Sequence, residues 1–303
     1  MMRITLTGAT GRIGLSIVEA LAGRGDDVTV LSRDPSRARD KLPTIVAVEA
    51  WDPKSGPAPA DALRGRDAVI HLAGEDVAQR WSDKAKREIH DSREIGTRNL
   101  VAGIEAVAGD RPRTLVSASA AGLYGARGDE PVDEDTPAAD GFLAGVVVAW
   151  EREARRAEEL GLRVALMRNG VVLSPDAGAL KKMLPPFKLG VGGPAGGGRQ
   201  YLPWVHLDDV VGIYVAAVDD DRWSGPFNVV APNAVTNRDF SKALGRALRR
   251  PAVAPVPGFA LKLLYGEMSQ IVLTGANMVP RRALELGYAF RHPEVDGALT
   301  ATV

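Results

Sequence analysis

The sequence of 303 residues contains no cysteine. Disulfide bonds, thiolate metal sites and cysteine nucleophiles are therefore excluded. An excess of charge of either sign is also absent, because 38 Lys and Arg residues balance 38 Asp and Glu residues. This neutrality argues against nucleic acid or an anionic membrane as the main partner. The length suffices for one large α/β domain and a smaller lobe.

Long apolar runs are missing as well. No run of 18 apolar residues occurs, and the chain enters a strand at its third residue. We therefore expect neither a transmembrane segment nor a signal peptide, and a cytoplasmic location. We also expect no metal site, because the histidines show no metal-ligand spacing; they are His71, His90, His206 and His292.

The most informative stretch is a glycine-rich turn between a predicted strand at 3–7 and a predicted helix at 15–22. Its first glycine allows a tight turn, its second lets the backbone approach a pyrophosphate, and its third lets helix and strand pack closely. The free N–H groups of the helix N-terminus favour phosphate. The turn predicts a dinucleotide site, with a plain βα turn as the alternative. The predicted contacts are Gly8, Thr10, Gly11, Arg12, Ile13 and Gly14.

The tip of the second predicted strand, 27–31, indicates which dinucleotide is bound. An acidic residue there would accept from a ribose 2′-hydroxyl and favour NAD. Ser32 and Arg33 occupy the tip instead, and a guanidinium matches a 2′-phosphate in charge and geometry. NADP(H) is therefore favoured, although Asp34 follows at once. Arg12 is either a second phosphate contact or a solvated arginine at the helix start.

The pattern of strands and helices predicts an α/β fold. Strands predicted at 45–48, 67–71, 113–117 and 163–168 alternate with helices at about 83–107 and 141–160. Such alternation builds a doubly wound parallel sheet with helices on both faces. Right-handed crossovers bring the carboxyl ends of the strands to one edge. Further cofactor contacts are predicted at these ends: Asp52, Leu72, Ala73, Gly74, Ser117, Arg168 and Gly170.

The composition changes after residue 173. We predict a dinucleotide-binding domain at 1–175, to which 200–225 returns, and a smaller α+β substrate-facing lobe at 176–303. Residues 184–187, with two prolines, and 191–198, with five glycines, are predicted to lack regular structure. The glycine-rich stretch is typical of a binding loop or lid. The following helix is predicted to end at Val218, with Asp208 or Asp209 as its cap.

Several motifs together resemble the short-chain dehydrogenase/reductase superfamily in its extended, epimerase-like form. They are the glycine turn, His71-Leu72-Ala73-Gly74, Gly96-Thr97-Arg98-Asn99-Leu100, Tyr124-Gly125 and Val205-His206-Leu207-Asp208-Asp209. Other stretches are similar to one epimerase-like branch with a C-terminal domain of unknown function, here at about 250–298; they include Ser92-Arg93, Trp150-Glu151 and Gly266-Glu267-Met268. The resemblance implies a Rossmann-like domain that binds NADP(H), and it does not supply a substrate.

The catalytic set of that superfamily is a Ser or Thr, a Tyr and a Lys four residues after the Tyr. Aligning Glu151 with the family's glutamate places Leu143 at the tyrosine position and Val147 at the lysine position. Without a phenol there, another group must act as general acid or base. Ser119 is the candidate for a polar contact to substrate. Counting back four residues from Tyr124, as the superfamily pattern requires, reaches Ala120, which is one place away. The alternative is a hydroxyl bonded to the local backbone.

Few other groups are candidates for moving a proton. Glu75 follows the fourth strand and can point into the crevice, or it is a solvated loop carboxylate. Tyr124 is a further candidate, in a position that is usually supportive in the superfamily. His206 belongs to a motif that mainly braces the two lobes. A pocket for an anionic or planar ligand is expected from three residues: Arg80, Trp81 and Arg199. The alternative is that they serve loop packing and surface charge.

Two functions remain open at this point. The first is an NADP(H)-dependent oxidoreductase or epimerase that acts on an unknown small carbonyl or sugar-like substrate with a non-standard acid/base. The second is a non-catalytic NADP(H)-binding regulatory or sensor protein. We expect a monomer or a homodimer, in which the helices at 83–107 and 141–160 would form the interface.

Overall fold

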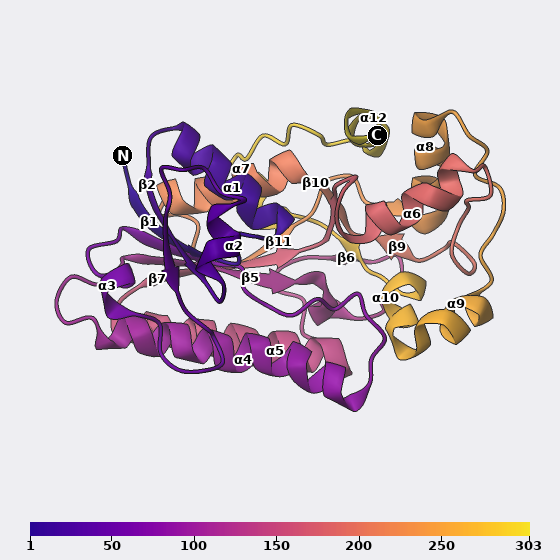
Figure 1. The fold of residues 1–303 in the computed structure, drawn as a ribbon. Coiled ribbons are helices and arrows are strands. Elements are labelled where there is room, and N and C mark those ends of the chain that lie inside the picture. Colours follow the sequence, from indigo (N-terminus) through magenta and orange to yellow (C-terminus); the bar gives the residue numbers. More distant parts are fainter.

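A seven-stranded sheet forms the centre of the computed structural model, which describes residues 1–303 (Figure 1). Its strand order is β11-β7-β5-β4-β1-β2-β3, and every neighbouring pair is parallel. The strands are β1 (Arg3–Thr7), β2 (Asp27–Ser32), β3 (Ala47–Ala50), β4 (Ala68–His71), β5 (Thr114–Ala120), β7 (Arg163–Asn169) and β11 (Gly225–Val229). The prediction of a doubly wound parallel sheet is confirmed.

Helices cover both faces of the sheet (Figure 1). One face carries α1 (Arg12–Gly23) and α7 (Leu207–Asp219), and the other carries α3 (Ala60–Leu63), α4 (Asp83–Ala106) and α5 (Phe142–Arg155). The strands are apolar on both sides, as this arrangement requires. Along β4, for example, Ile70 packs into the core under α1, and Val69 packs into the core over α4. The helix predicted at 141–160 continues from α5 as a 3₁₀ helix, Arg156–Leu160.

The smaller lobe is built on a separate apolar core. Its helices are α6 (Gly178–Lys188), α8 (Asn237–Leu248), α9 (Gly258–Tyr265), α10 (Gln270–Leu273) and α12 (Val295–Thr302). Leu184, Phe240 and Leu299, from three of these helices, meet in that core. Short strands pair as β8 (Val171–Leu173) with β10 (Trp204–His206), β9 (Tyr201–Leu202) with β12 (Val235–Thr236), and β6 (Pro131–Val132) with β13 (Asn277–Met278). The other short helices are α2 (Pro35–Arg39), α11 (Arg281–Glu285) and two 3₁₀ turns, Ala121–Tyr124 and Gly266–Ser269.

The prolines at 185 and 186 lie inside α6, so the prediction of irregular structure at 184–187 is wrong. Proline removes a backbone donor and disturbs the preceding turn. Here Leu184 and Phe187 are both buried in the core of the smaller lobe, and this packing outweighs the lost hydrogen bonds. The helix continues past both prolines, and at its end the Pro185 carbonyl accepts from the Leu189 amide at 3.2 Å. Residues 191–198 contain no helix or strand, as predicted.

The segment that returns to the larger domain runs further than predicted. β11 lies at the edge of the main sheet, paired with β7, so the return extends to Val229 rather than stopping at residue 225. The chain comes back once more near its end, where Tyr288 and Phe290 pack against the core under α1 and α7.

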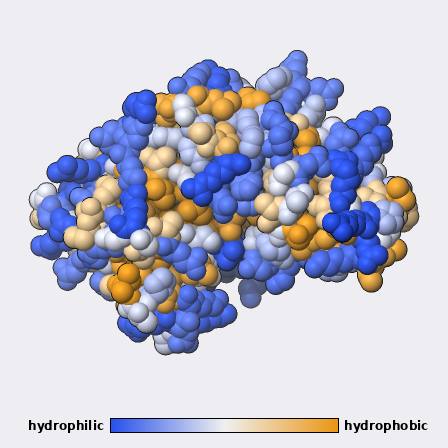
Figure 2. Space-filling view, turned by 90° about the horizontal axis from the view of Figure 1, so that it is seen from above, coloured by the Kyte–Doolittle hydropathy of each residue, from blue (hydrophilic) through white to orange (hydrophobic).

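Each helix of the structure is too short or too polar to span a lipid bilayer. The face that carries α1 and α7 shows separate apolar patches among hydrophilic side chains (Figure 2).

Candidate functional site

A cavity of about 440 Å³ opens at the carboxyl ends of β1 to β4. This edge of a parallel sheet is where the fold places ligands, because the βα loops gather there. The structure brings ten of the predicted site residues to the cavity wall: Gly8, Thr10, Gly11, Ser32, Arg33, Asp52, Leu72, Ala73, Gly74 and Glu75.

The glycine turn has the geometry that a dinucleotide cradle needs. Gly8 has a φ of +74°, and a Cβ on it would lie 2.7 Å from the Leu72 carbonyl carbon, so no other residue fits. A Cβ on Gly14 would collide with the Gly8 carbonyl oxygen, which explains why α1 can pack against the turn. Gly11 is the N-cap residue of α1 and has no side chain that could form a capping hydrogen bond. The first turn of α1 also contains no acidic residue. The first N–H groups of α1 are therefore free for an anion.

Arg12, Ile13 and Gly14 do not line the cavity. The Nε of Arg12 instead lies 3.4 Å from Oδ1 of Asp176, so its side chain points to the smaller lobe. Of the two roles left open for Arg12, the structure favours the partly exposed arginine at the helix start over a second phosphate contact. Gly14 allows α1 to pack closely on the turn, and its backbone N–H belongs to the first turn of α1.

Basic side chains gather at the adenosine end of the cavity, next to the carboxylates of Asp34 and Asp52. Arg33, Arg37 and Lys41 line it, and none of the three forms an ion pair. Asp34 forms no ion pair with them; its Oδ1 caps α2 by accepting from the Arg37 backbone amide at 3.0 Å and the Ser36 hydroxyl at 2.6 Å. The hydrogen bond from Ser36 is the main reason that the pKa of Asp34 is lowered. Arg37 and Lys41 escaped the sequence analysis, although both follow Arg33 at intervals of four residues.

The floor of the cavity is held by buried polar side chains. The Thr7 hydroxyl oxygen accepts from the amides of Leu72 and Ala73 at 3.2 and 3.3 Å. It also lies 2.7 Å from Nδ1 of His71, whose Nε2 lies 3.1 Å from Oγ1 of Thr97. Burial, with a smaller contribution from Arg93, lowers the pKa of His71 to about 4. His71 is therefore a neutral brace for the end of β4.

A second polar cluster lies away from the cavity, between β5, β7 and α5. Arg168 binds Glu151 through two hydrogen bonds, from Nε at 2.8 Å and from Nη2 at 3.0 Å. The Ser119 hydroxyl donates to the same carboxylate at 2.6 Å. The Tyr124 hydroxyl accepts from Nη1 of Arg168 and donates to Oδ1 of Asn228, both at 2.7 Å. All five side chains are buried.

This cluster corrects the roles predicted for Ser119, Tyr124 and Arg168. Their polar atoms are already paired inside the protein, so they are not positioned to contact a ligand in the crevice. Burial is the main cause that raises the pKa of Tyr124 to about 12, which makes it a poor general acid or base near neutral pH.

Two more predicted cofactor contacts also lie outside the cavity. Ser117 is fully buried, and its hydroxyl donates to the Ala118 carbonyl at 3.2 Å. Gly170 packs against the Pro203 carbonyl and Val230, which leave no room for a Cβ. Both positions serve the packing of strand ends rather than a ligand.

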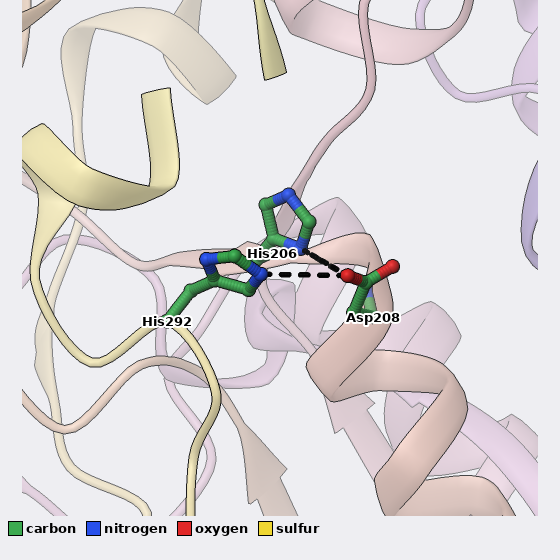
Figure 3. Close-up of side chains that lie close together, drawn as sticks. All are labelled: His206, Asp208 and His292. Carbon is green, nitrogen blue, oxygen red and sulfur yellow. Dashed lines mark hydrogen bonds and ion pairs between the residues drawn. The ribbon is translucent and has the colours of Figure 1, made fainter. Parts of the chain in front are cut away.

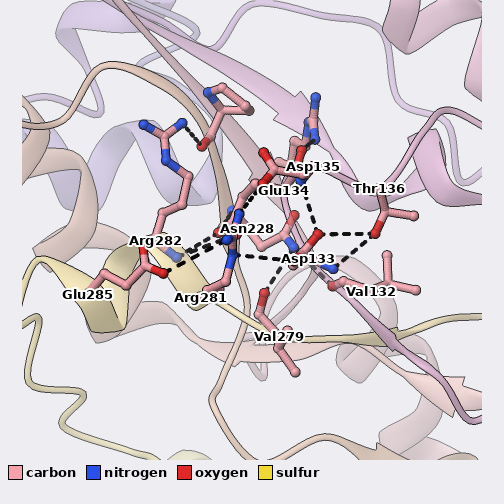
Figure 4. A network of polar contacts seen from close by, with 12 residues as sticks. Val132, Asp133, Glu134, Asp135, Thr136, Asn228, Val279, Arg281, Arg282 and Glu285 are labelled. Atoms are coloured by element: carbon pink, nitrogen blue, oxygen red, sulfur yellow. Dashed lines mark hydrogen bonds and ion pairs between the residues drawn. The ribbon is translucent and has the colours of Figure 1, made fainter.

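The cluster continues toward the C-terminal part of the chain (Figure 4). The carboxylate of Glu134 accepts from the backbone amide of Asn228 at 3.0 Å. The side-chain Nδ2 of Asn228 donates to the Val132 and Val279 carbonyls. Arg281 reaches Oδ2 of Asp133 at 3.2 Å. Burial is the main cause that raises the pKa of Glu134. The acidic loop, β11 and the C-terminal segment are thus tied together.

Leu143 and Val147, which the sequence analysis places at the Tyr and Lys positions of the superfamily, make apolar contacts. Val147 is buried with Leu123 and Met278. Leu143 lies against Gly122, where a Cβ would be 3.3 Å away, and against the small core around Trp81. Neither position can donate or accept a proton.

The three residues suggested for an anionic or planar ligand do not form one pocket. Trp81 is buried, with its ring 5.1 Å from that of Phe142 and its Nε1 donating to the Val77 carbonyl at 3.0 Å. Arg80 is exposed beside Gly266, and Arg199 is exposed in the glycine-rich loop. None of the three lines the cavity.

His206 also lies outside the cavity. Its Nδ1 accepts from the Asp208 amide at 3.1 Å, so His206 caps α7, and the predicted cap at Asp208 or Asp209 is wrong. Asp209 is buried and accepts from the amides of Arg291 and His292 at 2.7 and 3.0 Å.

Comparison with known proteins agrees with this geometry. Residues 4–230 match the model of the NAD dependent epimerase/dehydratase family. The chain belongs to this family. Residues 256–302 match a second model, "Domain of unknown function (DUF1731)". The family and the C-terminal domain are those that the motifs suggested.

Several members of the family are similar over nearly the whole chain. A chloroplastic "Epimerase family protein SDR39U1 homolog" from Arabidopsis thaliana is 40% identical, covering 99% of this chain and 86% of its own length. "Epimerase family protein Mb2239" from Mycobacterium bovis is 39% identical, covering 98% and 96%. The crystal structure of human epimerase family protein SDR39U1 with NADPH superimposes with a TM-score of 0.87 at 33% identity and covers 99% of both chains.

Proposed function

We propose that this epimerase-family protein binds NADP(H) in the crevice, with the 2′-phosphate between Arg33, Arg37 and Lys41. The observation that carries the proposal is the set of three cations at the adenosine end, none of which forms an ion pair. A 2′-phosphate offers the charge and the acceptors that these side chains lack. The human relative that was crystallised with NADPH supports the same choice.

The rest of the cofactor follows the wall of the cavity. The pyrophosphate would lie over Gly8 and Gly11, against the uncapped N-terminus of α1. The nicotinamide half would pass Leu72 to Gly74, where the backbone is held from below by Thr7. The bound cofactor would supply or accept a hydride.

We propose oxidoreduction or epimerisation of a small carbonyl or sugar-like substrate as the chemistry. Glu75 is the acid/base candidate that lines the crevice, because it follows β4 and is only partly buried. Its backbone is fixed by two contacts: its amide donates to Oγ of Ser92 at 3.0 Å, and its carbonyl accepts from Arg93 at 3.0 Å. Its side-chain contact is weaker, with Oε1 at 3.4 Å from Nε2 of Gln79, so the carboxylate is free to turn toward a substrate.

A non-catalytic NADP(H) sensor is the second candidate. It is favoured by one specific observation: every superfamily position for proton transfer is apolar or internally paired. Leu143 and Val147 pack in apolar clusters, and Ser119 donates to Glu151. A protein of this kind would bind the cofactor without consuming it.

Fluorescence titration of the purified protein with NADPH and NADH tests the binding proposal. We expect NADPH to bind at least about tenfold more tightly, which is the effect of about 1.4 kcal/mol. Equal affinities would overturn the role of the three cations. A panel of carbonyl and sugar substrates then separates the two candidates. Turnover that Glu75→Gln abolishes supports the enzyme, and tight NADPH binding without oxidation across the panel supports the sensor.

A further inference from the structure

Three side chains that commonly bind metal ions meet at the N-terminus of α7 (Figure 3). His206 ends β10, Asp208 lies in the first turn of α7, and His292 comes from the segment between α11 and α12. One potential ligand atom of each lies within 4.8 Å of those of the other two. None of the three lines the dinucleotide cavity, so the cluster is separate from the proposed cofactor site.

The spacing of the ligand atoms suits one small metal ion. Nε2 of His292 lies 3.4 Å from Oδ2 of Asp208, and Nδ1 of His206 lies 3.7 Å from the same oxygen. Two ligands of a tetrahedral zinc ion, each about 2.1 Å from it, are separated by about 3.4 Å. The two imidazole rings face each other with centroids 3.7 Å apart, and both nitrogens point to the carboxylate (Figure 3).

The chemistry of the three ligands selects the metal. Two imidazoles and one carboxylate suit Zn²⁺ and its neighbours among the transition metals, whereas Ca²⁺ and Mg²⁺ prefer oxygen ligands alone. A histidine ligand must be neutral. Asp208 is about half exposed, at 51% of its side chain, so a hydrated ion can reach the cluster.

The surrounding structure holds the third ligand in place. Oδ2 of the buried Asp209 accepts from the His292 amide at 3.0 Å, and its Oδ1 accepts from the Arg291 amide at 2.7 Å. These bonds fix the backbone of the segment that carries His292. One hydrogen bond opposes metal binding, because Nδ1 of His206 now accepts from the Asp208 amide. That amide lies in the first turn of the helix beside an exposed side chain, where water can replace the lost acceptor.

We propose that His206, Asp208 and His292 form a binding site for one divalent transition-metal ion, with Zn²⁺ as the best fit and water completing its coordination. The ion joins the segment before α12 to the N-terminus of α7. The segment also packs Tyr288 and Phe290 on the main core. Metal binding therefore stabilises the contact between the C-terminal segment and the dinucleotide-binding domain.

Isothermal titration of the full-length, chelator-treated protein with Zn²⁺ tests this site. We expect one saturable site per chain and a rise in melting temperature with added Zn²⁺. The absorption spectrum with Co²⁺ in place of Zn²⁺ reports the coordination geometry. His292→Ala should weaken Zn²⁺ at least about tenfold, because even losing a partner outside the ligand set has an effect of this size. His292 is preferred to His206 for substitution, since His206 also caps α7.

His90→Ala is the matched control. His90 is also partly exposed beside carboxylates, with Nδ1 at 3.3 Å from Asp91 and 3.4 Å from Glu94. Zn²⁺ binding should survive this change. NADPH binding by each variant verifies that the fold is intact. The absence of saturable binding, equal affinity in the wild type and His292→Ala, or loss of binding in His90→Ala alone would each overturn the proposal.

Discussion

Arg168 and Glu151 are joined by two hydrogen bonds, at 2.8 and 3.0 Å, in the interior between β7 and α5. This pair holds Ser119 and Tyr124, which the superfamily pattern would place near a substrate, in a closed network. The region next to the missing Tyr and Lys is therefore occupied by structural contacts. An intact cofactor crevice in this protein is consequently no evidence for catalysis by the usual residues.

Arg168→Met is expected to lower the free energy of unfolding by about 3–5 kcal/mol, because it leaves the Glu151 carboxylate buried without its charged partner. Denaturant unfolding measures this change. The control is Arg246→Ala, which removes an ion pair with Asp296 in which both side chains are more than half exposed. We expect the control to change stability by about 1 kcal/mol or less. Folded Arg168→Met should bind NADPH as the wild type does. Specific loss of affinity would restore Arg168 as a cofactor contact.

Arg37→Ala is expected to weaken NADPH and to leave NADH nearly unchanged. A hydrogen bond to a charged group contributes about 1.5–3 kcal/mol, which corresponds to roughly 10- to 100-fold in Kd. Arg39→Ala is the control on the same helix, because Arg39 donates to the Val48 carbonyl and does not line the cavity. Fluorescence titration of both variants with both cofactors makes the comparison. A parallel loss of NADPH and NADH affinity in Arg37→Ala would argue against a 2′-phosphate contact.

Gly14→Ala is expected to destabilise the protein by about 1–3 kcal/mol and to weaken NADPH. The new methyl group would collide with the Gly8 carbonyl, so α1 and the turn must move apart. Gly23→Ala, at the other end of α1, meets no atom within 4 Å and should stabilise the protein by about 0.4–1 kcal/mol. Thermal unfolding with and without NADPH distinguishes the two. Similar behaviour of both variants would contradict the packing role of Gly14.

Glu134 predicts a pH dependence of stability. Because burial raises its pKa in the folded protein, the folded state favours the protonated carboxyl more than the unfolded state does. The contribution of Glu134 is therefore fully present below the unfolded pKa of about 4.3 and is lost as the pH rises through the higher folded pKa. Relative to Glu134→Gln, the wild type should become less stable as the pH increases above about 4. Urea unfolding of both proteins across this range checks the sign, and the opposite trend would refute it.

Much of the fold could be predicted from the sequence because its determinants are local. The order of strands and helices follows from apolar periodicity, and the crevice follows from the fact that parallel strands end at one edge. Gly8 and Arg33 follow directly on a strand and Gly74 comes three residues after one, so their place in the cavity is fixed by that rule. The sequence analysis missed Arg37 and Lys41, although Arg33, Arg37 and Lys41 follow one another at intervals of four residues in and around α2.

The sequence by itself determined the dinucleotide crevice and the place of Arg33 at its adenosine end, and it predicted the loss of the Tyr-Lys pair, since each depends on residues close together in the chain or at known strand ends. Only the tertiary structure decided the partners of buried polar groups. Whether Arg168 faces a cofactor or Glu151 depends on how α5 packs on the sheet. Likewise, the four histidines have no metal spacing in the chain, yet folding brings His292 to His206 because buried Asp209 binds the backbone of the C-terminal segment.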